Sequence, residues 1–212
     1  MPTIIPAILT ESFEDLRRQI RRVDGLFPYV HLDVMDGKFV HKRSFIEVEK
    51  IPEIGTGLQY ELHLMVNDPL AEMKKWQHIP HVFRVIIHRE APASLEACRT
   101  FAKEHDWEFG MALNPDTPLE VVIPYFKELD YLLFMTVYPG RQGAPFQEQV
   151  LPKIQQLLAH EGHPRFGVDG SINISTIHNF KNLSVDVLNV GSALMLASNI
   201  EKAYLELKDK LL

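Results

Sequence analysis

Three short segments place histidines and aspartates where they could bind a metal ion or transfer a proton. The first covers residues 29–37, Tyr-Val-His-Leu-Asp-Val-Met-Asp-Gly, in which His31 and Asp33 lie two positions apart. Side chains at positions i and i+2 of a β-strand point to the same face, so an imidazole and a carboxylate share one face here. Two similar short apolar runs contain His63 and Asp169. These side chains could therefore converge on one point.

Imidazole and carboxylate ligands together suit Zn²⁺, Fe²⁺, Mn²⁺ or Co²⁺ and leave room for substrate oxygens. The spacing does not select one of these metals. The alternative interpretation is that His31 and Asp33 form a buried hydrogen-bonded pair, while His63 packs in the core. Each uncompensated buried polar group would cost on the order of 1 to 3 kcal/mol, which favours a shared functional site.

Short apolar runs alternate with longer amphipathic runs along the whole chain. The predicted strands cover residues 3–9, 29–34, 58–65, 82–87, 108–113, 131–136, 165–168 and 185–190. The predicted helices cover residues 12–23, 69–76, 94–104, 118–126, 146–160, 174–179 and 193–211. Only the stretch after Gly37 lacks a clear helix. This alternation predicts an α/β fold, a (β/α)8 TIM barrel, with a doubly wound open sheet as the alternative.

The predicted barrel would gather the polar residues at one end. Active sites of (β/α)8 barrels lie at the carboxyl ends of the strands, in the loops that lead into the helices. His31, Asp33, His63 and Asp169 all fall near such ends. No linker or change in composition divides the chain, so we expect one domain over residues 1–212.

The composition excludes several classes of partner. The 212 residues are 46% hydrophobic and 24% charged, as in a globular protein with one full core. A net charge of −6 gives no attraction to nucleic acid or anionic membranes, and we expect neither as a partner. Without a signal-peptide pattern or an apolar run of about 18 residues, a cytoplasmic location is expected. Cys98 is the only cysteine, which we interpret as a packing residue.

Five segments resemble the signature segments of the ribulose-phosphate 3-epimerase family, in the order of that family. They are His-Leu-Asp-Val-Met-Asp-Gly at 31–37, His-Leu-Met-Val at 63–66, Leu-Asn-Pro-Asp-Thr-Pro at 113–118, Met-Thr-Val-Tyr-Pro-Gly at 135–140 and Val-Asp-Gly at 168–170. The resemblance implies a ribulose-phosphate-binding barrel. It also implies that one divalent metal ion is bound by His31, Asp33, His63 and Asp169.

The implied reaction inverts C3 of a ketose phosphate. Inversion beside a ketone removes a proton from one face and returns one to the other, through an enediolate. Asp33 and Asp169 could alternate as base and acid, and the resemblance assigns both roles to these residues. The expected conversion is D-ribulose 5-phosphate to D-xylulose 5-phosphate, in the pentose phosphate pathway. The same chemistry on D-allulose 6-phosphate is the alternative.

Further residues of the predicted site line the substrate cavity. Met35, Met65 and Met135 match methionines that surround the enediolate in the family, where thioethers would provide a water-poor wall. Core packing is the alternative role for them. Backbone amides in the loops after the last three strands are expected to bind the phosphate, at Gly140, Arg141, Gln142, Gly143, Gly170, Ser171, Gly191 and Ser192.

Departures from the family pattern concern the substrate. Residues 140–144, Gly-Arg-Gln-Gly-Ala, stand where the family usually has Gly-Phe-Gly-Gly-Gln. Ser171 replaces a second glycine, Ala7 replaces a serine, and residues 38–43 replace a Val-Pro-Asn element. Arg141 and Lys42 could contact phosphate or sugar, or be solvated surface charges. The intact metal and proton-transfer residues favour epimerase chemistry and leave the sugar open.

Two other functions compete with the epimerase. Sugar-phosphate and nucleotide decarboxylases of similar barrels place a lysine where this chain has Met35, and without it no cation can protonate the carbanion. A homologue that binds a phosphosugar without turnover is the remaining alternative, although Asp33 and Asp169 argue against it. Relatives commonly form dimers or hexamers, so a homo-oligomer is expected.

Overall fold

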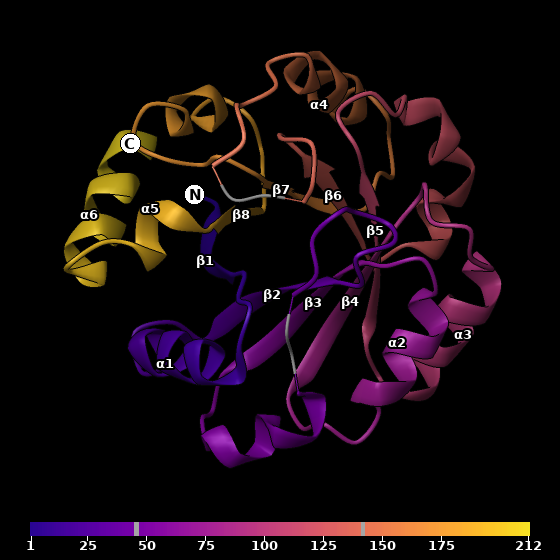
Figure 1. Cartoon of the computed structure of the whole chain (residues 1–212). Helices are drawn as coiled ribbons and strands as arrows, with labels where there is room; N and C mark the ends of the chain where they lie inside the picture. Colours follow the sequence, from indigo (N-terminus) through magenta and orange to yellow (C-terminus); the bar gives the residue numbers. More distant parts are fainter. Residues whose placement is uncertain (45–46, 141–142) are drawn as a thin grey trace.

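The computed structural model describes residues 1–44, 47–140 and 143–212. Its parallel strands form a closed barrel in the order of the sequence, because β1 pairs with both β2 and β8 (Figure 1). The strands are β1 (Thr3–Ile8), β2 (Tyr29–Met35), β3 (Gln59–Met65), β4 (Val82–His88), β5 (Glu108–Leu113), β6 (Tyr131–Met135), β7 (Arg165–Asp169) and β8 (Val187–Val190). The predicted (β/α)8 barrel is confirmed, and the open sheet is excluded.

Helices surround the barrel on its outside (Figure 1). The α-helices are α1 (Phe13–Val23), α2 (Pro69–Trp76), α3 (Leu95–Glu104), α4 (Val150–Leu158), α5 (Ser192–Met195) and α6 (Ile200–Leu211). The 3-10 helices are η1 (Val48–Ile54), η2 (Leu119–Val121), η3 (Ile123–Glu128) and η4 (Ile177–Phe180). Side-chain oxygens of Ser12, Asp68, Ser94 and Asn199 accept backbone N–H groups at the starts of α1, α2, α3 and α6. These caps explain where the helices begin.

Several predicted helices differ from the structure. Residues 118–126 form η2 and η3 instead of one α-helix, since Pro124 has no N–H to donate within a longer helix. The predicted helix 174–179 is replaced by the short η4, which begins at Ile177 and ends at Phe180, and residues 146–160 are α-helical only in α4. The last predicted helix, 193–211, is two helices, because the Asn199 side chain starts α6 anew. The stretch after Gly37 contains η1, which was not predicted.

Successive side chains of each strand point alternately out of the barrel and into it, which creates two separate apolar regions. The larger region fills the space between strands and helices and includes Leu32, Leu62 and Val168. A smaller region lies inside the barrel and includes Ile5, Ile86 and Leu133. Cys98 of α3 packs in the larger region, and burial raises the pKa of its thiol to about 11, in line with a packing role.

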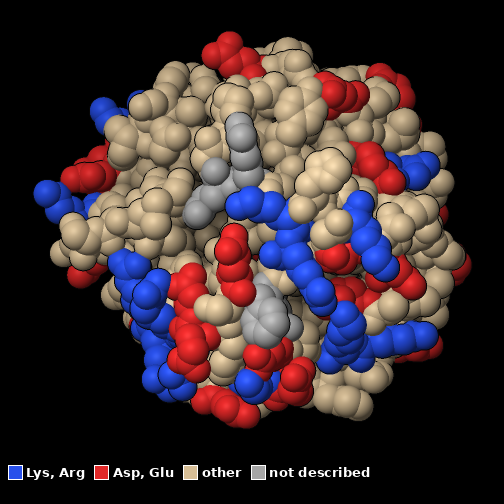
Figure 2. All heavy atoms as spheres, viewed as in Figure 1, with Lys and Arg blue, Asp and Glu red and all other residues tan. Residues whose placement is uncertain are grey.

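Strand register brings the polar residues to one end of the barrel. Asp33 pairs with His63 across β2 and β3, and Met135 pairs with Asp169 across β6 and β7. Each of these residues lies within two positions of the carboxyl end of its strand. The face of the molecule in Figure 2 carries basic and acidic side chains in adjacent patches. None of the helices in the described ranges is long and apolar enough to cross a membrane.

Candidate metal and proton-transfer site

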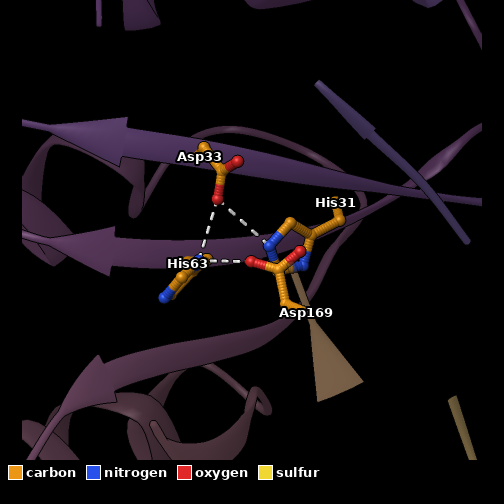
Figure 3. Close-up of side chains that lie close together, drawn as sticks. All are labelled: His31, Asp33, His63 and Asp169. Atoms are coloured by element: carbon orange, nitrogen blue, oxygen red, sulfur yellow. Dashed lines mark hydrogen bonds and ion pairs between the residues drawn. The ribbon is translucent and has the colours of Figure 1, made fainter. Parts of the chain in front are cut away.

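The structure brings together the histidines and aspartates singled out by the sequence. His31, Asp33, His63 and Asp169 each offer one ligand atom, and these atoms all lie within 4.8 Å of one another. Oδ1 of Asp33 lies 2.8 Å from Nδ1 of His63 and 3.3 Å from Nε2 of His31. Oδ2 of Asp169 lies 3.7 Å from the same Nδ1 of His63 (Figure 3). Residues from three strands therefore surround one small volume.

The surroundings of His31 show whether these four residues suit a metal ion. Its Nδ1 lies 2.6 Å from Oε1 of Glu61, while its buried Nε2 faces Asp33 without a hydrogen bond to any described residue. Burial alone would lower the pKa of His31, but Asp33 and Glu61 raise it well above the usual value. The carboxylates thus favour positive charge beside Nε2. A divalent cation bound there would supply that charge and a partner for Nε2.

The two aspartates have opposite pKa shifts. Burial opposes ionisation of Asp33, yet the nearby charge of His31 and the hydrogen bond from His63 hold its pKa well below its usual range. Burial and the neighbouring Asp33 charge raise the pKa of Asp169 to about 6. Near neutral pH, Asp33 is an ionised carboxylate and Asp169 can exchange a proton. Such a pair can provide both a base and an acid in one site.

A cavity that is partly open to solvent lies against both aspartates. Its wall includes all the methionines predicted there, Met35, Met65 and Met135. The loop residues expected to bind phosphate also line it wherever they are described, namely Gly140, Gly143, Gly170, Ser171, Gly191 and Ser192. Arg141 and Gln142 lie outside the described residues. Ala7 and Leu9 line the cavity from the first strand and the loop that follows it.

A tight turn holds Asp169 in place. The hydroxyl of Thr136 donates to the carbonyl oxygens of Gly170 at 2.6 Å and Asp169 at 3.1 Å. Gly170 has φ +118°, and a Cβ at this position would lie 2.6 Å from a methyl group of Val137. Glycine is therefore required by both backbone conformation and space.

Ser171 is a departure from the family pattern whose side chain has a clear role in the fold. Its hydroxyl donates to the carbonyl oxygen of Ala144, which joins the loop after β7 to the loop after β6. Its backbone has φ +49°, in the left-handed region that non-glycine residues seldom adopt. Thus Ser171 lines the cavity while its hydroxyl contributes to the packing of two loops.

Two buried residues beside the site, His88 and Glu61, are not among those predicted from the sequence. Nε2 of His88 lies 2.9 Å from Nε2 of His63, and burial lowers the pKa of His88 to about 4. The predicted fourth strand ended at residue 87, one position before His88, whereas β4 includes it. Glu61 lies two positions before His63 in β3, so the two side chains point to the same inner face of the barrel. This spacing is the signal by which Glu61 could have been identified from the sequence.

Comparison with known proteins gives one consistent family. The model of the Ribulose-phosphate 3 epimerase family matches residues 3–195. The ribulose-phosphate 3-epimerase of Bacillus subtilis (strain 168) is 32% identical over 221 residues, covering 98% of this chain and 99% of the relative. That of Schizosaccharomyces pombe is 28% identical over 214 residues, covering 99% of this chain and 93% of the relative.

Solved structures of other proteins share the fold. A crystal structure of KGPDC from Streptococcus mutans has a TM-score of 0.75 at 14% identity, covering 99% of this chain and 97% of that one. 3-Keto-L-gulonate-6-phosphate decarboxylase from Vibrio cholerae has a TM-score of 0.71 at 16% identity, covering 99% of this chain and 97% of that one. At these identities the similarity concerns the barrel alone.

Proposed function

We propose that this chain, which belongs to the ribulose-phosphate 3-epimerase family of carbohydrate isomerases, converts D-ribulose 5-phosphate to D-xylulose 5-phosphate. The proposal rests on one observation: Asp33 and Asp169 line one cavity and lie within a few ångströms of His31 and His63. Inversion of C3 needs a proton acceptor and a proton donor, and this site offers one of each.

The aspartates divide the proton transfer. Asp33, with its pKa held low by the histidines, accepts the C3 proton from one face of the sugar. Asp169, with a pKa of about 6, returns a proton to the other face. In the reverse direction the residues exchange roles, since each then begins in the other protonation state.

His31, Asp33, His63 and Asp169 would hold one divalent metal ion, with Zn²⁺, Fe²⁺, Mn²⁺ and Co²⁺ as candidates. When bound, the ion supplies positive charge that stabilises negative charge on the substrate oxygens. The residues themselves fix the position of the carboxylates, because Asp33 is held between two imidazoles. This arrangement restricts proton transfer to defined directions.

Other cavity residues would bind and shield the sugar phosphate. The side chains of Met35, Met65 and Met135 exclude water and offer no exchangeable proton, which limits stray protonation of the enediolate. Backbone amides of Gly143, Gly170, Ser171, Gly191 and Ser192 would bind the phosphate. Support comes from their place on the same cavity wall as the aspartates.

D-Allulose 6-phosphate is the second candidate substrate. The wall near the aspartates carries no hydroxyl at Ala7, and the Ser171 hydroxyl is already bonded to Ala144. Both are departures from the usual pattern close to the sugar. They provide a reason to compare the six-carbon phosphate directly with the five-carbon one.

The decisive experiment follows deuterium at C3 of the substrate. Metal-loaded protein is incubated in D₂O with D-ribulose 5-phosphate and, separately, with D-allulose 6-phosphate, and NMR follows deuterium entry and epimer formation. We expect both to occur faster with the pentulose phosphate. Faster exchange with D-allulose 6-phosphate would make that sugar the substrate. Absence of exchange with either, despite bound metal, would contradict the proposal in favour of binding without turnover.

A further inference from the structure

A buried ion pair lies inside the barrel, next to the candidate metal ligands. Nη1 of Arg84 in β4 lies 2.5 Å from Oε2 of Glu61 in β3. The two residues are only 4% and 0% exposed. Strand register places Glu61 between Arg84 and His31, since it pairs with the arginine on one side and the histidine on the other. A row of inward-facing residues thus leads from the arginine to the histidine.

Glu61 has fixed partners on both carboxylate oxygens. Oε1 lies 2.6 Å from Nδ1 of His31 and accepts the side-chain N–H of Asn189 at 3.1 Å. Oε2 accepts from Arg84. Because both oxygens are bonded, the carboxylate cannot rotate without breaking a contact. It therefore holds the His31 ring with Nδ1 towards itself and Nε2 towards the metal-site carboxylates.

Arg84 is itself held from two further directions. Its Nε donates to Oε2 of Glu108 at 2.7 Å, and its guanidinium lies 3.8 Å from the centre of the Tyr131 ring. Tyr131 can occupy this position because Gly167 has no side chain, and a Cβ there would overlap the Tyr131 hydroxyl. The surrounding side chains thus fix the guanidinium that Glu61 contacts.

Stability alone does not account for this ion pair. Taking two charges out of water is costly, and apolar residues of similar volume are often as stable or more so. Apolar side chains such as Ile86 and Leu133 do occupy other inward-facing positions of the barrel. Groups that hold the far nitrogen of a metal-binding histidine orient the ring and raise its affinity for metal. Glu61 has that geometry, and Arg84 fixes Glu61.

We propose that Arg84 is a positioning residue, which orients His31 for metal binding by holding Glu61 in place. This inference rests on the proposed function, in which His31 is a metal ligand. Arg84 makes no hydrogen bond to the described metal-site residues and does not line the substrate cavity. Its effect reaches the site only through Glu61, and this dependence can be measured.

The test compares the Co²⁺ affinity of metal-stripped protein among variants. Co²⁺ is titrated while visible absorption reports the ligand geometry around the ion. We expect Arg84→Met to weaken Co²⁺ binding about tenfold and to alter the absorption spectrum, and Glu61→Gln to weaken it at least as much. The double variant Glu61→Gln, Arg84→Met should bind no more weakly than Glu61→Gln alone, because Arg84 acts through Glu61.

Arg165→Met is the matched control. Arg165 also contacts Glu108, at 2.5 Å, but does not contact Glu61, and its side chain is 55% exposed. Its replacement should leave Co²⁺ affinity within about twofold of the unmodified protein, since the histidine-binding carboxylate keeps its partners. Circular dichroism and thermal unfolding establish that each variant is folded before titration.

Two results would overturn the inference. One is an Arg84→Met protein whose Co²⁺ affinity and spectrum match those of the unmodified protein. The other is a double variant weakened by the product of the single effects, which would mean that Arg84 acts independently of Glu61. If Arg84→Met alone fails to fold, a double variant that binds Co²⁺ more weakly than Glu61→Gln still overturns the inference. The proposed function stays intact if the inference about Arg84 is overturned while the unmodified protein still binds Co²⁺ and catalyses exchange at C3. If the unmodified protein does not bind Co²⁺, both the inference and the proposed function are contradicted.

Discussion

Asp33 of β2 and His63 of β3 pair directly in the register of neighbouring parallel strands, and Oδ1 of Asp33 lies 2.8 Å from Nδ1 of His63. The residues are 30 positions apart in the sequence. This contact places the low-pKa carboxylate beside a candidate metal ligand. The two functions proposed for the site, metal binding and proton transfer, therefore depend on neighbouring side chains that contact each other.

Replacement of Asp169 should abolish most of the activity without unfolding the barrel. Asp169→Asn keeps the size of the side chain but cannot exchange the carboxyl proton, so kcat for C3 inversion should fall by about 10² to 10⁴. Kinetic assay and thermal unfolding measure the two effects. Asp209→Asn, at an exposed position of α6, is the matched control and should behave like the unmodified protein. Near-full activity of Asp169→Asn would show that the two-carboxylate mechanism is wrong.

Removal of metal should lower both activity and thermal stability. His31 Nε2 is buried without a hydrogen bond to any described residue, and Asp33 and Asp169 face the same small volume, so a bound cation should stabilise the folded state. At a metal concentration of about 100 times the Kd, the stabilisation is about 2.7 kcal/mol. Thermal unfolding before chelation, after chelation and after return of Zn²⁺, Mn²⁺ or Co²⁺ measures it. His63→Ala should show little response, and an equal midpoint in all three states of the unmodified protein would speak against a metal site.

Glu61 should contribute stability that is lost in acid. Burial alone would raise its pKa, but the hydrogen bond from His31 and the charge of Arg84 lower it to about 2 from a usual value of 4.5. Because the folded-state pKa is depressed, the contribution is complete above about pH 4.5 and declines as the pH falls towards 2. Urea unfolding of metal-free protein measures the free energy of unfolding at each pH.

The matched comparison is Glu61→Gln, which does not titrate at this position. From pH 6 to pH 3, the stability advantage of the unmodified protein over this variant should shrink by on the order of 2 kcal/mol. An advantage that stays constant over this range would mean that Glu61 has an ordinary pKa in the folded protein.

Gly170→Ala should destabilise the protein more than Gly162→Ala. Both glycines have positive φ, but a Cβ at Gly170 would meet Val137 at 2.6 Å, whereas a Cβ at Gly162 would meet nothing within 4 Å. The steric overlap should add about 1 to 3 kcal/mol to the conformational cost shared by both. Urea unfolding of the two variants gives the difference.

Val137→Ala tests the cause of that difference. In the background of Gly170→Ala, it removes the methyl groups that the new Cβ would meet and should restore part of the lost stability. The recovery stays partial, because the backbone nitrogen of Val137 would still lie 2.9 Å away. Equal costs for the Gly170 and Gly162 variants would contradict this account of the turn.

The strands were easier to predict than the helices. Residues 108–113 were predicted as a strand and form β5, because a buried strand reads as a short apolar run. The pattern of residues 193–211 predicts one amphipathic helix, yet the structure has two helices, α5 and α6, separated by a short non-helical segment. The side chain of Asn199 bonds to the backbone and starts a new helix instead of continuing the previous one. Hydrophobic periodicity contains no signal for such a cap.

By itself, the sequence determined the alternation of strands and helices and the inward position of His31, Asp33, His63 and Asp169 near strand ends. Both follow from local periodicity and from the two-residue repeat of a strand. The resemblance to a known family added their expected roles.

Only the tertiary structure decided how closely these residues meet and what supports them. Closure of the barrel brings β7 to the same small volume as β2 and β3. Contacts such as Arg84 with Glu61, or His88 with His63, depend on register between strands and on space left by residues such as Gly167. Register and packing arise from the whole barrel, so no single segment of the sequence contains them.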